Sequence, residues 1–176
     1  MSLVELWQTG IVSGFETLYS RYKDMVFRTA LSMTGNVHEA EDILQMTFIR
    51  VYKARDKFKG DENALKRWLY RVTINQCLDF HRKKKSRSLG YSLDRMMENG
   101  FQPRVEFSNS KQEVEEMVYL AVGCLDDKHR SAVTLRYFEG LPNEEIAKIL
   151  NIPLGTVKSR LNTAMKMMRQ RLVKEK

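Results

Sequence analysis

The sequence predicts an all-α fold of two small helical domains joined by a flexible linker. Apolar residues recur at spacings of three and four along most of the chain, which is the period of an amphipathic helix. Only three prolines and nine glycines interrupt the 176 residues. The period fades between Ser86 and Ser110, where Ser, Asn, Gly and Pro are spread throughout, and so long a stretch is typical of a linker. We therefore expect domains at residues 1–85 and 111–176, with the linker at 86–110.

The bulk composition points to a polyanionic partner. The formal net charge is +8 and the pI is near 9.5, which suits a nucleic-acid-binding protein but equally a ribosomal protein or a membrane-surface binder. No apolar run approaches the length of a membrane span, and the N-terminus lacks the pattern of a signal peptide. Cys77 and Cys124 show no partner spacing. We expect no disulfide framework, no membrane insertion and a cytoplasmic location.

Two helices are expected at the start of the first half. Apolar positions over residues 15–33 mark the first helix, which ends at Gly35. Asn36 stands where a capping box places its N-cap, so a second helix is expected over residues 37–58. One face of this second helix is expected to be buried. Its core positions are Ala40, Ile43, Leu44, Thr47, Phe48 and Val51.

The opposite face of the second helix is more apolar than contact with solvent requires. Met46, Ile49 and Tyr52 lie on it beside polar and charged side chains. Two interpretations remain open at this point. Either the face docks on another protein, or one or more of these residues pack against another helix.

A break at residues 59–63 precedes a third helix, expected over residues 64–85. Gly60 in the break can adopt backbone angles that other residues avoid. Aromatic side chains alternate with cations along the helix, a mixture that suits unstacked bases as well as phosphates. Two simpler interpretations compete: Trp68 is a core residue, and the basic cluster at residues 82–85 complements the helix dipole. We favour nucleic-acid binding, because the glycine break and the downstream motif agree with it.

The second half ends in a helix-turn-helix pattern. A helix around residues 114–125, and another capped by Asp126 or Asp127, precede it. The first helix of the motif has Asn143 as its expected N-cap, and Pro153 enforces a stop over residues 151–155. The second helix has a basic face suited to a DNA major groove, although any helical hairpin with a basic face would look similar. Its apolar stripe consists of Val157, Leu161, Ala164, Met168 and Leu172.

Most of the chain resembles a sigma-70 family initiation factor of the small extracytoplasmic-function (ECF) group. The segment HEAEDILQMTFIRVYKARDKFKG is similar to the second region of that family, and RWLYRVTINQCLDFHRKKK to its promoter-melting helix. The segment LRYFEGLPNEEIAKILNIPLGTVKSRLNTAMKMMRQRL is similar to the fourth region, and IPLGTVKSRL is its most specific part. The resemblance implies a transcription initiation factor that binds core RNA polymerase and directs it to specific promoters. It also implies that the first domain melts and reads the minus-10 element and that the helix-turn-helix reads the minus-35 element.

The resemblance further implies partners and residue roles. The partners are core polymerase (its β′ clamp helices and β flap), promoter DNA and an anti-sigma factor. The polymerase-binding residues are Asp42, Gln45, Met46, Phe48, Ile49, Arg50 and Tyr52, with Met46 where the family usually has an acidic residue. The minus-10 residues are Lys59, Gly60, Asp61, Glu62, Asn63, Ala64, Arg67, Trp68, Arg71, Asn75 and Arg82. The minus-35 residues are Thr156, Lys158, Ser159, Arg160, Asn162, Thr163 and Lys166.

The length of the linker has a mechanical consequence. About 25 residues span at most roughly 85 Å when extended, but on average only about 28 Å as a flexible coil. Promoter elements some two helical turns apart therefore demand a stretched linker. We infer that polymerase holds the two domains apart and that the free protein can fold them together. Such closure is expected to hide both the docking face and the DNA-binding helices.

Two other classes of function compete with this interpretation. A free-standing helix-turn-helix regulator would use only the second half and would bind duplex DNA tightly without polymerase. An enzyme is not expected, because the three histidines lie far apart and no glycine-rich phosphate loop or nucleophile motif is present. Cys77 and His81 lie one helical turn apart and could form half a metal site, but a surface histidine beside a buried cysteine is the simpler interpretation. We expect no cofactor and no metal.

Overall fold

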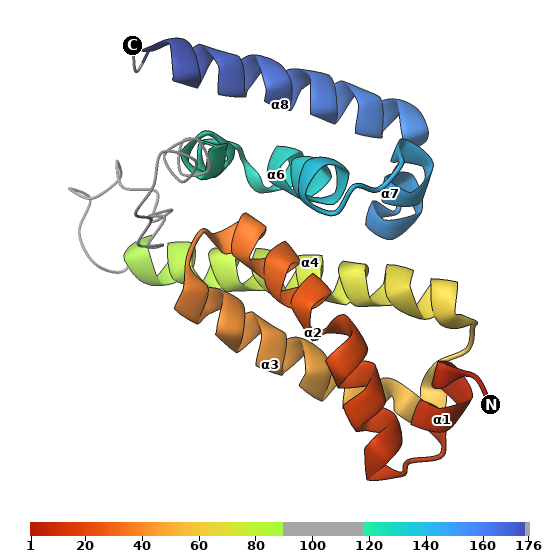
Figure 1. The fold of residues 1–176 in the computed structure, drawn as a ribbon. Helices are drawn as coiled ribbons and strands as arrows, with labels where there is room; N and C mark the ends of the chain where they lie inside the picture. Colours follow the sequence, from red (N-terminus) through yellow and green to blue (C-terminus); the bar gives the residue numbers. More distant parts are fainter. Residues whose placement is uncertain (90–117, 175–176) are drawn as a thin grey trace, which may run out of the picture.

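The computed structural model describes residues 1–89 and 118–174, in which every regular element is a helix (Figure 1). The predicted all-α class is confirmed. The predicted linker from residue 90 onward, and the predicted helix 114–125 up to residue 117, lie outside the described residues. The first half contains α1 (Leu3–Gln8), α2 (Val12–Thr34), α3 (Val37–Ala54), the short turn η1 (Arg55–Lys57) and α4 (Glu62–Leu89). The second half contains a helical segment at 118–123, α6 (Asp127–Val133), the π-helical turn η3 (Thr134–Phe138), α7 (Asn143–Leu150) and α8 (Leu154–Lys174).

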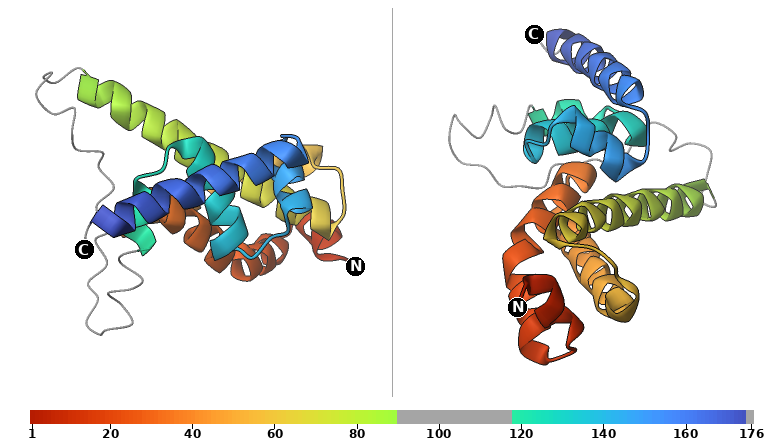
Figure 2. Two further views of the ribbon diagram at one scale, coloured as in Figure 1. Left: turned by 90° about the horizontal axis from the view of Figure 1, so that it is seen from above. Right: turned by 90° about the vertical axis from the view of Figure 1, so that its right-hand side faces the viewer.

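The helices form three layers, and the two halves of the chain pack against each other (Figure 2). One layer holds α2, α3 and α4, with α1 at its edge; α6 and α7 lie on it, and α8 covers their far side. α4 contacts α2 and α3 as well as α7. Because α4 has neighbours on several sides, residues that point in different directions around it are buried: Leu69, Tyr70, Thr73 and Ile74. α4 is thus the central helix of the molecule.

Apolar and polar contacts join the two halves into one interior. Leu150, at the end of α7, packs on an apolar cluster that includes Met33, Ile43 and Ile74 of the first half. Arg130 of α6 is 8% exposed and donates hydrogen bonds to backbone carbonyls of its own half and, at 3.0 Å, to the carbonyl of Met33. A buried guanidinium is tolerated only when its donors are satisfied. The two halves are folded together in this structure, as we inferred from the length of the linker.

α1 is an element that the sequence analysis missed. Ser2 and Glu5 form a reciprocal capping box, in which the Ser2 hydroxyl accepts from the Glu5 amide and the Glu5 carboxylate accepts from the Ser2 amide. Trp7, on this short helix, is 1% exposed. The Ser-x-x-Glu spacing is visible in the sequence and would have revealed the helix.

The predicted boundary between α2 and α3 is confirmed, but α2 begins earlier than predicted, at Val12, and α3 ends earlier, at Ala54. Gly35 has the left-handed backbone conformation (φ 66°) that ends α2, and the Asn36 side chain accepts a hydrogen bond from the Glu39 amide at 3.1 Å. The predicted core positions of α3 are buried, except that Leu44 is half-buried.

α4 is longer than predicted at both ends. It begins at Glu62 because the Asp61 carboxylate accepts the Ala64 amide hydrogen at 2.7 Å, which caps the helix two residues early. It continues to Leu89, immediately before Gly90, so residues 86–89 are helical and not part of an irregular linker.

The helix-turn-helix forms where the sequence placed it, with two local corrections. Pro142 occupies the N-cap position of α7, and Asn143 is the first helical residue instead of the cap. The stop is also shorter than predicted: Asn151 ends α7 in a left-handed conformation (φ 54°), and α8 begins at Leu154. Asp126, one of the two predicted caps, caps α6. The stripe residues Val157, Leu161 and Ala164 are buried and Met168 is half-buried, as expected; the Leu172 side chain lies outside the described residues.

Candidate nucleic-acid and protein interfaces

The outer face of α8 gathers the predicted minus-35 residues on one exposed surface. α8 forms the outermost layer of the molecule (Figure 1), so the side opposite its buried stripe meets solvent. The Ser159 hydroxyl donates to the Thr156 carbonyl at 3.0 Å, within the first turns of the helix. Lys158, Ser159, Asn162, Thr163 and Lys166 are exposed, whereas Thr156 and Arg160 are half-buried. The arrangement presents hydroxyl, amide and ammonium groups along a helix that can enter a major groove.

The predicted minus-10 loop is shorter and more constrained than its sequence suggested. Gly60 has φ 149°, and a Cβ there would lie 2.7 Å from the Cβ of Ala64 and 3.4 Å from the Phe58 ring. Lys59, Gly60, Asp61 and Asn63 are exposed, but Glu62, Asn63 and Ala64 belong to the first turn of α4. The exposed loop proper is therefore the segment 59–61.

Glu62 is held by two residues of α2. Arg21 approaches its carboxylate at 2.5 Å, and the Tyr22 hydroxyl donates to it at 3.2 Å. Burial, and next the Glu62 charge, raise the pKa of Tyr22 to about 12. These contacts fix the first turn of α4 on α2 and so fix the position of the loop.

Trp68 belongs to an aromatic cluster with Trp7 and Phe58. The Trp68 ring centroid lies 5.5 Å from that of Phe58 and 6.5 Å from that of Trp7, and Trp68 is half-buried. Trp68 is therefore in part a core residue, as the simpler interpretation predicted. Phe58 joins this cluster to the turn at residues 58–60, because its ring packs on both Trp7 and Trp68.

Several polar residues of α4 that were assigned to promoter DNA lie against the second half. Arg71 donates to the backbone carbonyls of Ile149 (2.9 Å) and Lys148 (2.6 Å) at the end of α7. Arg67 lies 3.6 Å from the Glu145 carboxylate. Asn75 and Arg82 are exposed, and Arg82 pairs with Asp79 of its own helix. The predicted strand-binding set is thus divided between residues that contact the second half and residues that do not.

A buried carboxylate lies between the halves. The Glu139 side chain is 1% exposed; it accepts from the Tyr70 hydroxyl at 3.0 Å and from Arg28 at 3.4 Å. Its other oxygen is buried without a hydrogen-bond partner among the described residues. Burial, followed by the charge of Glu139, raises the pKa of Tyr70. Sequence reasoning missed this group, since Glu139 stands in an ordinary-looking turn before Gly140.

His81 also lies between the halves, and the prediction of a surface histidine is wrong. Its side chain is 18% exposed, and Nδ1 lies 2.8 Å from an Asp127 carboxylate oxygen. Hydrogen bonding to His81 lowers the pKa of Asp127 against the opposing effect of burial. Cys77 is buried as expected, and burial raises the pKa of its thiol. Within the described residues no group of three or more His, Cys, Asp or Glu side chains could hold a metal ion.

The predicted polymerase-docking face of α3 is open, with one exception. Met46, Ile49 and Tyr52 are 45%, 53% and 55% exposed, so no described helix buries them, although the Tyr52 ring packs against Phe15 of α2. Phe48 is the exception: it is 4% exposed, because the rings of Phe15 and Tyr19 on α2 cover it. The other exposed members of the set are Asp42, Gln45 and Arg50.

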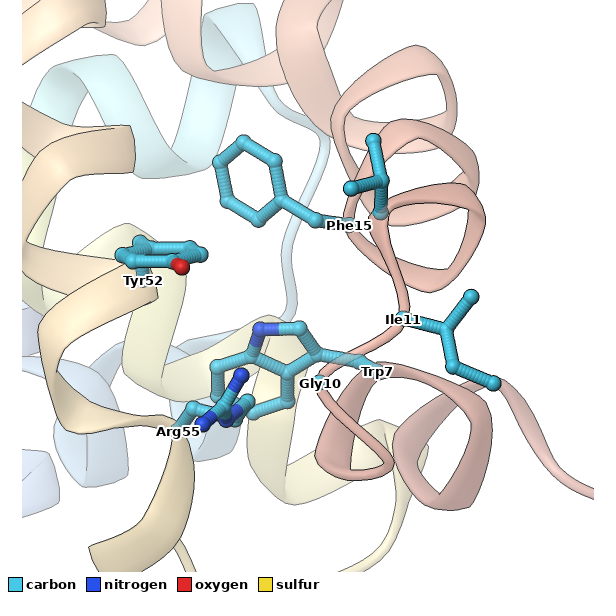
Figure 3. A pocket seen from close by; sticks show the side chains of 7 residues that line it. Trp7, Gly10, Ile11, Phe15, Tyr52 and Arg55 are labelled. Atoms are coloured by element: carbon cyan, nitrogen blue, oxygen red, sulfur yellow. The ribbon is translucent and has the colours of Figure 1, made fainter.

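The apolar surface continues beyond the predicted set onto the start of α2. The rings of Phe15 and Tyr52 meet edge-on, with their centroids 5.4 Å apart. Ile11 and Val12 are exposed beside these rings. Figure 3 shows a small pocket here, between Phe15 and Tyr52 on one side and Trp7 and Arg55 on the other. We call the exposed residues Ile11, Val12, Tyr19, Met46, Ile49 and Tyr52 the apolar patch.

The expectation that closure hides every functional surface is wrong in part. Packing of the two halves brings Arg67 and Arg71 of α4 into contact with α7, although Arg71 stays exposed and Arg67 half-buried. The apolar patch and the outer face of α8 stay exposed, because α7 and not α8 faces the first half (Figure 1).

Comparisons with known proteins agree with this architecture. A family model for Sigma-70 region 2 matches residues 18–87, and one for Sigma-70, region 4 matches residues 115–168. The chain is 34% identical to the ECF RNA polymerase sigma factor SigW of Bacillus subtilis, over 93% of this chain and 91% of SigW. It is 32% identical to the ECF RNA polymerase sigma-E factor of Escherichia coli, over 90% of this chain and 86% of that protein.

Two solved structures share the fold. CnrH, in complex with the cytosolic domain of CnrY, superimposes with a TM-score of 0.72 at 20% identity and covers 99% of this chain and 97% of its own. The sigma factor RpoE, in complex with the anti-sigma factor NepR from Bartonella quintana, has a TM-score of 0.71 at 24% identity and covers 92% and 98%. At these identities the likeness establishes the fold alone. Among the described helices, none is both long and apolar enough to cross a membrane.

Proposed function

This chain belongs to the ECF group of RNA polymerase sigma factors, which direct the polymerase to promoters, and we propose how its surfaces divide that work. Residues 1–85 bind core polymerase and act on the minus-10 element. Residues 111–176 read the minus-35 element, and residues 86–110 connect the two, with the end of α4 included in the connection. The matched ranges of the two family models support this division.

The apolar patch is the proposed contact with the β′ clamp helices of polymerase. Contiguous exposed apolar side chains mark protein-interaction sites on soluble proteins. Met46 adds to this patch at a position where the family resemblance implies an acidic residue, so we propose that apolar contact replaces a polar one at this position. The second half contacts the β flap.

α8 is the proposed reader of the minus-35 element, and the exposure of its outer face is the observation that carries the proposal. Lys158 and Lys166 can contact phosphates, while Ser159, Asn162 and Thr163 can bond base edges. Arg160 is half-buried and can extend its guanidinium to a guanine from the edge of the face.

The loop at residues 59–61 and the exposed side of α4 are the proposed minus-10 site. Extruding a base from a duplex costs a few kcal/mol, and a pocket for that base offsets the cost. The rigid Gly60 turn, supported by Phe58, offers a fixed rim for such a pocket. Asn75 and Arg82 are already exposed for contact with the strand.

The family membership has three further consequences for this chain. Sigma factors are initiation factors without enzymatic activity, and we propose that this chain performs no catalysis and needs no cofactor. It acts where polymerase and the chromosome are, in the cytoplasm. An anti-sigma factor regulates it, a proposal supported by the solved complex of RpoE with NepR.

Reconstitution with core polymerase tests the proposal. Sequencing the 5′ ends of transcripts from genomic DNA should show starts downstream of two shared sequence elements that core enzyme alone does not select. Failure to start at any site would contradict the proposal. A free-standing regulator would instead give sequence-specific gel shifts without core enzyme and no new transcript starts with it.

A further inference from the structure

We propose that the small pocket between α1, the start of α2 and the end of α3 binds one glutamate side chain of core RNA polymerase. We call it the Trp7 pocket; its walls are Trp7, Phe15, Tyr52 and Arg55 (Figure 3). The proposal rests on the function proposed above for the apolar patch and adds to it a site for a charged group. Two hydrogen-bond donors and two aromatic walls define what this site can hold.

The indole nitrogen of Trp7 is the first observation that points to a ligand. Trp7 is 1% exposed, and its Nε1–H group is buried without a hydrogen-bond partner among the described residues. Figure 3 shows this nitrogen on the edge of the indole that faces Phe15 and Tyr52. A buried donor without an acceptor is unfavourable, because it has lost its hydrogen bond to water. An acceptor oxygen that enters the pocket removes this cost.

Arg55 brings a positive charge to the same pocket. Its Nε donates to the Asp56 carboxylate at 2.8 Å, but that carboxylate lies at the surface, where such a pair contributes little. The outer end of the guanidinium lies against Gly10, on which a Cβ would come within 2.5 Å of Nη1. The guanidinium also lies 5.8 Å from the centroid of the Tyr52 ring. These neighbours hold the cation in the wall of the pocket, where it favours an anionic ligand.

The remaining walls favour a ligand with an apolar stem. The rings of Phe15 and Tyr52 are joined in the pocket lining by Ile11 and Val12. A wholly apolar side chain would leave the indole N–H unpaired and would desolvate the guanidinium without compensation. A glutamate meets both demands, because its methylene groups contact the rings while its carboxylate accepts hydrogen bonds from the two donors.

The position of the pocket indicates that polymerase supplies this side chain. Met46, Ile49 and Tyr52 recur at every third residue along the proposed docking face of α3. Arg55, in the turn η1, continues the row, so the row leads from the docking face into the pocket. Nine helical residues span about 14 Å, a distance that the anchor residues of one partner helix can cover. A clamp helix lying on α3 therefore reaches the Trp7 pocket.

The affinity of the full chain for core polymerase tests the pocket, with a fluorescent label on the exposed Cys124. Arg55→Met keeps the length of the side chain and removes its charge, and Lys57→Met, at an exposed position of the same turn, is its matched control. Val12→Asp adds a negative charge to the pocket lining. Ser13→Asp adds the same charge at the next, exposed position outside the lining.

We expect Arg55→Met and Val12→Asp each to weaken binding about tenfold, the effect of one lost bond between charged groups, while both controls stay within about twofold of the parent. Trp7→Phe, which lacks the indole N–H, should also bind core more weakly than the parent, and urea unfolding shows whether this variant is folded. Binding by Arg55→Met and Val12→Asp that equals binding by their controls would overturn the proposal.

Ile49→Asp separates the pocket from the function on which it rests, because Ile49 is exposed on the docking face and does not line the pocket. If Ile49→Asp weakens binding while Arg55→Met and Val12→Asp do not, the docking face stands and the pocket alone is refuted. If the parent chain does not bind core polymerase, the docking function is refuted and the pocket with it.

Photo-crosslinking identifies the occupant. Benzoylphenylalanine in place of the exposed Val12 should crosslink to the largest subunit of core polymerase, in a peptide that contains a glutamate. Changing that glutamate to glutamine should weaken binding of the parent but add little to the loss in Arg55→Met, as expected for two groups in contact. A crosslink to a second copy of this chain, a peptide without glutamate, or fully additive losses would each overturn the proposal.

Discussion

α4 and α8 both carry residues assigned to DNA, yet they occupy opposite places in the fold. α8 is an outer helix with one buried stripe and an open polar face. α4 is a central helix, and two of its arginines already bind oxygen atoms of the second half. The difference teaches that basic residues on a helix do not by themselves make a DNA surface. What lies against the helix decides whether the surface is ready or has to be uncovered.

Removal of the aromatic support under the α4 loop should give the largest effect. Trp7 is 1% exposed and packs on Phe58 and Trp68, so Trp7→Ala leaves a large cavity and should lower the free energy of unfolding by about 3–5 kcal/mol. Urea unfolding measures the change. Ile11→Ala, at a position 58% exposed, should change it by less than about 0.5 kcal/mol. Equal costs for the two variants would show that the cluster does not hold the loop.

Alkaline pH should weaken the first half through Tyr22. Its pKa is about 12 in the fold, while an unfolded tyrosine titrates near 10. The neutral hydroxyl therefore stabilises the fold fully below pH 10, and this contribution, up to about 2 kcal/mol, is lost as pH rises from 10 to 12. Tyr22→Phe should lose less unfolding free energy than the parent across that interval. Tyr19→Phe, whose parent residue is 37% exposed, should keep the parental slope.

Two glycines sharpen the comparison between the DNA surfaces. Gly60, beside α4, has φ 149° and no room for a Cβ, so Gly60→Ala should cost about 1–3 kcal/mol of unfolding free energy. Gly155, in the first turn of α8, has open space around its Cα, and Gly155→Ala should stabilise by up to about 1 kcal/mol. Thermal unfolding of both variants checks the two signs. The same sign at both positions would contradict the distinction between a constrained loop and an open helix.

Much of the fold was predictable, because α2 and α3 have an apolar period and a readable boundary between them. Gly35 and Asn36 are such signals, and the structure uses both. The start of α4 was harder, because Asp61 resembles a loop residue until its side chain is seen to cap the helix. The pairing of the two halves was not readable in residue detail, because contacts such as Arg71 with the Ile149 carbonyl involve backbone atoms.

The candidate sites, like the fold, could be predicted from the sequence only in part. The open face of α8 follows from the helical period alone, since every apolar stripe predicts a polar opposite side. Phe48 shows the limit: the period placed it toward the core and the family resemblance placed it in the docking set, and the structure buries it under α2. Glu139 gave no signal, because its burial depends on a packing of halves that are distant in sequence.

The smallest expected effect concerns α8. Lys158 is exposed on its outer face, and Lys158→Ala should weaken duplex binding uniformly across sequences and reduce the salt slope by about 1 if the ammonium contacts a phosphate. A loss of about 1–3 kcal/mol confined to one base pair would assign it to base reading instead. Titrations at several salt concentrations separate these results. Unchanged binding would place Lys158 off the interface.

Permanganate reactivity of promoter thymines tests most directly the claim that α8 positions the protein while α4 opens the DNA. Parent holoenzyme should make thymines of the minus-10 element reactive. Holoenzyme with Asn75→Ala and Arg82→Ala, two exposed α4 positions, should still protect the minus-35 element but should lose that reactivity. Full reactivity with these variants, or loss of minus-35 protection together with reactivity, would contradict the division of work between the two helices.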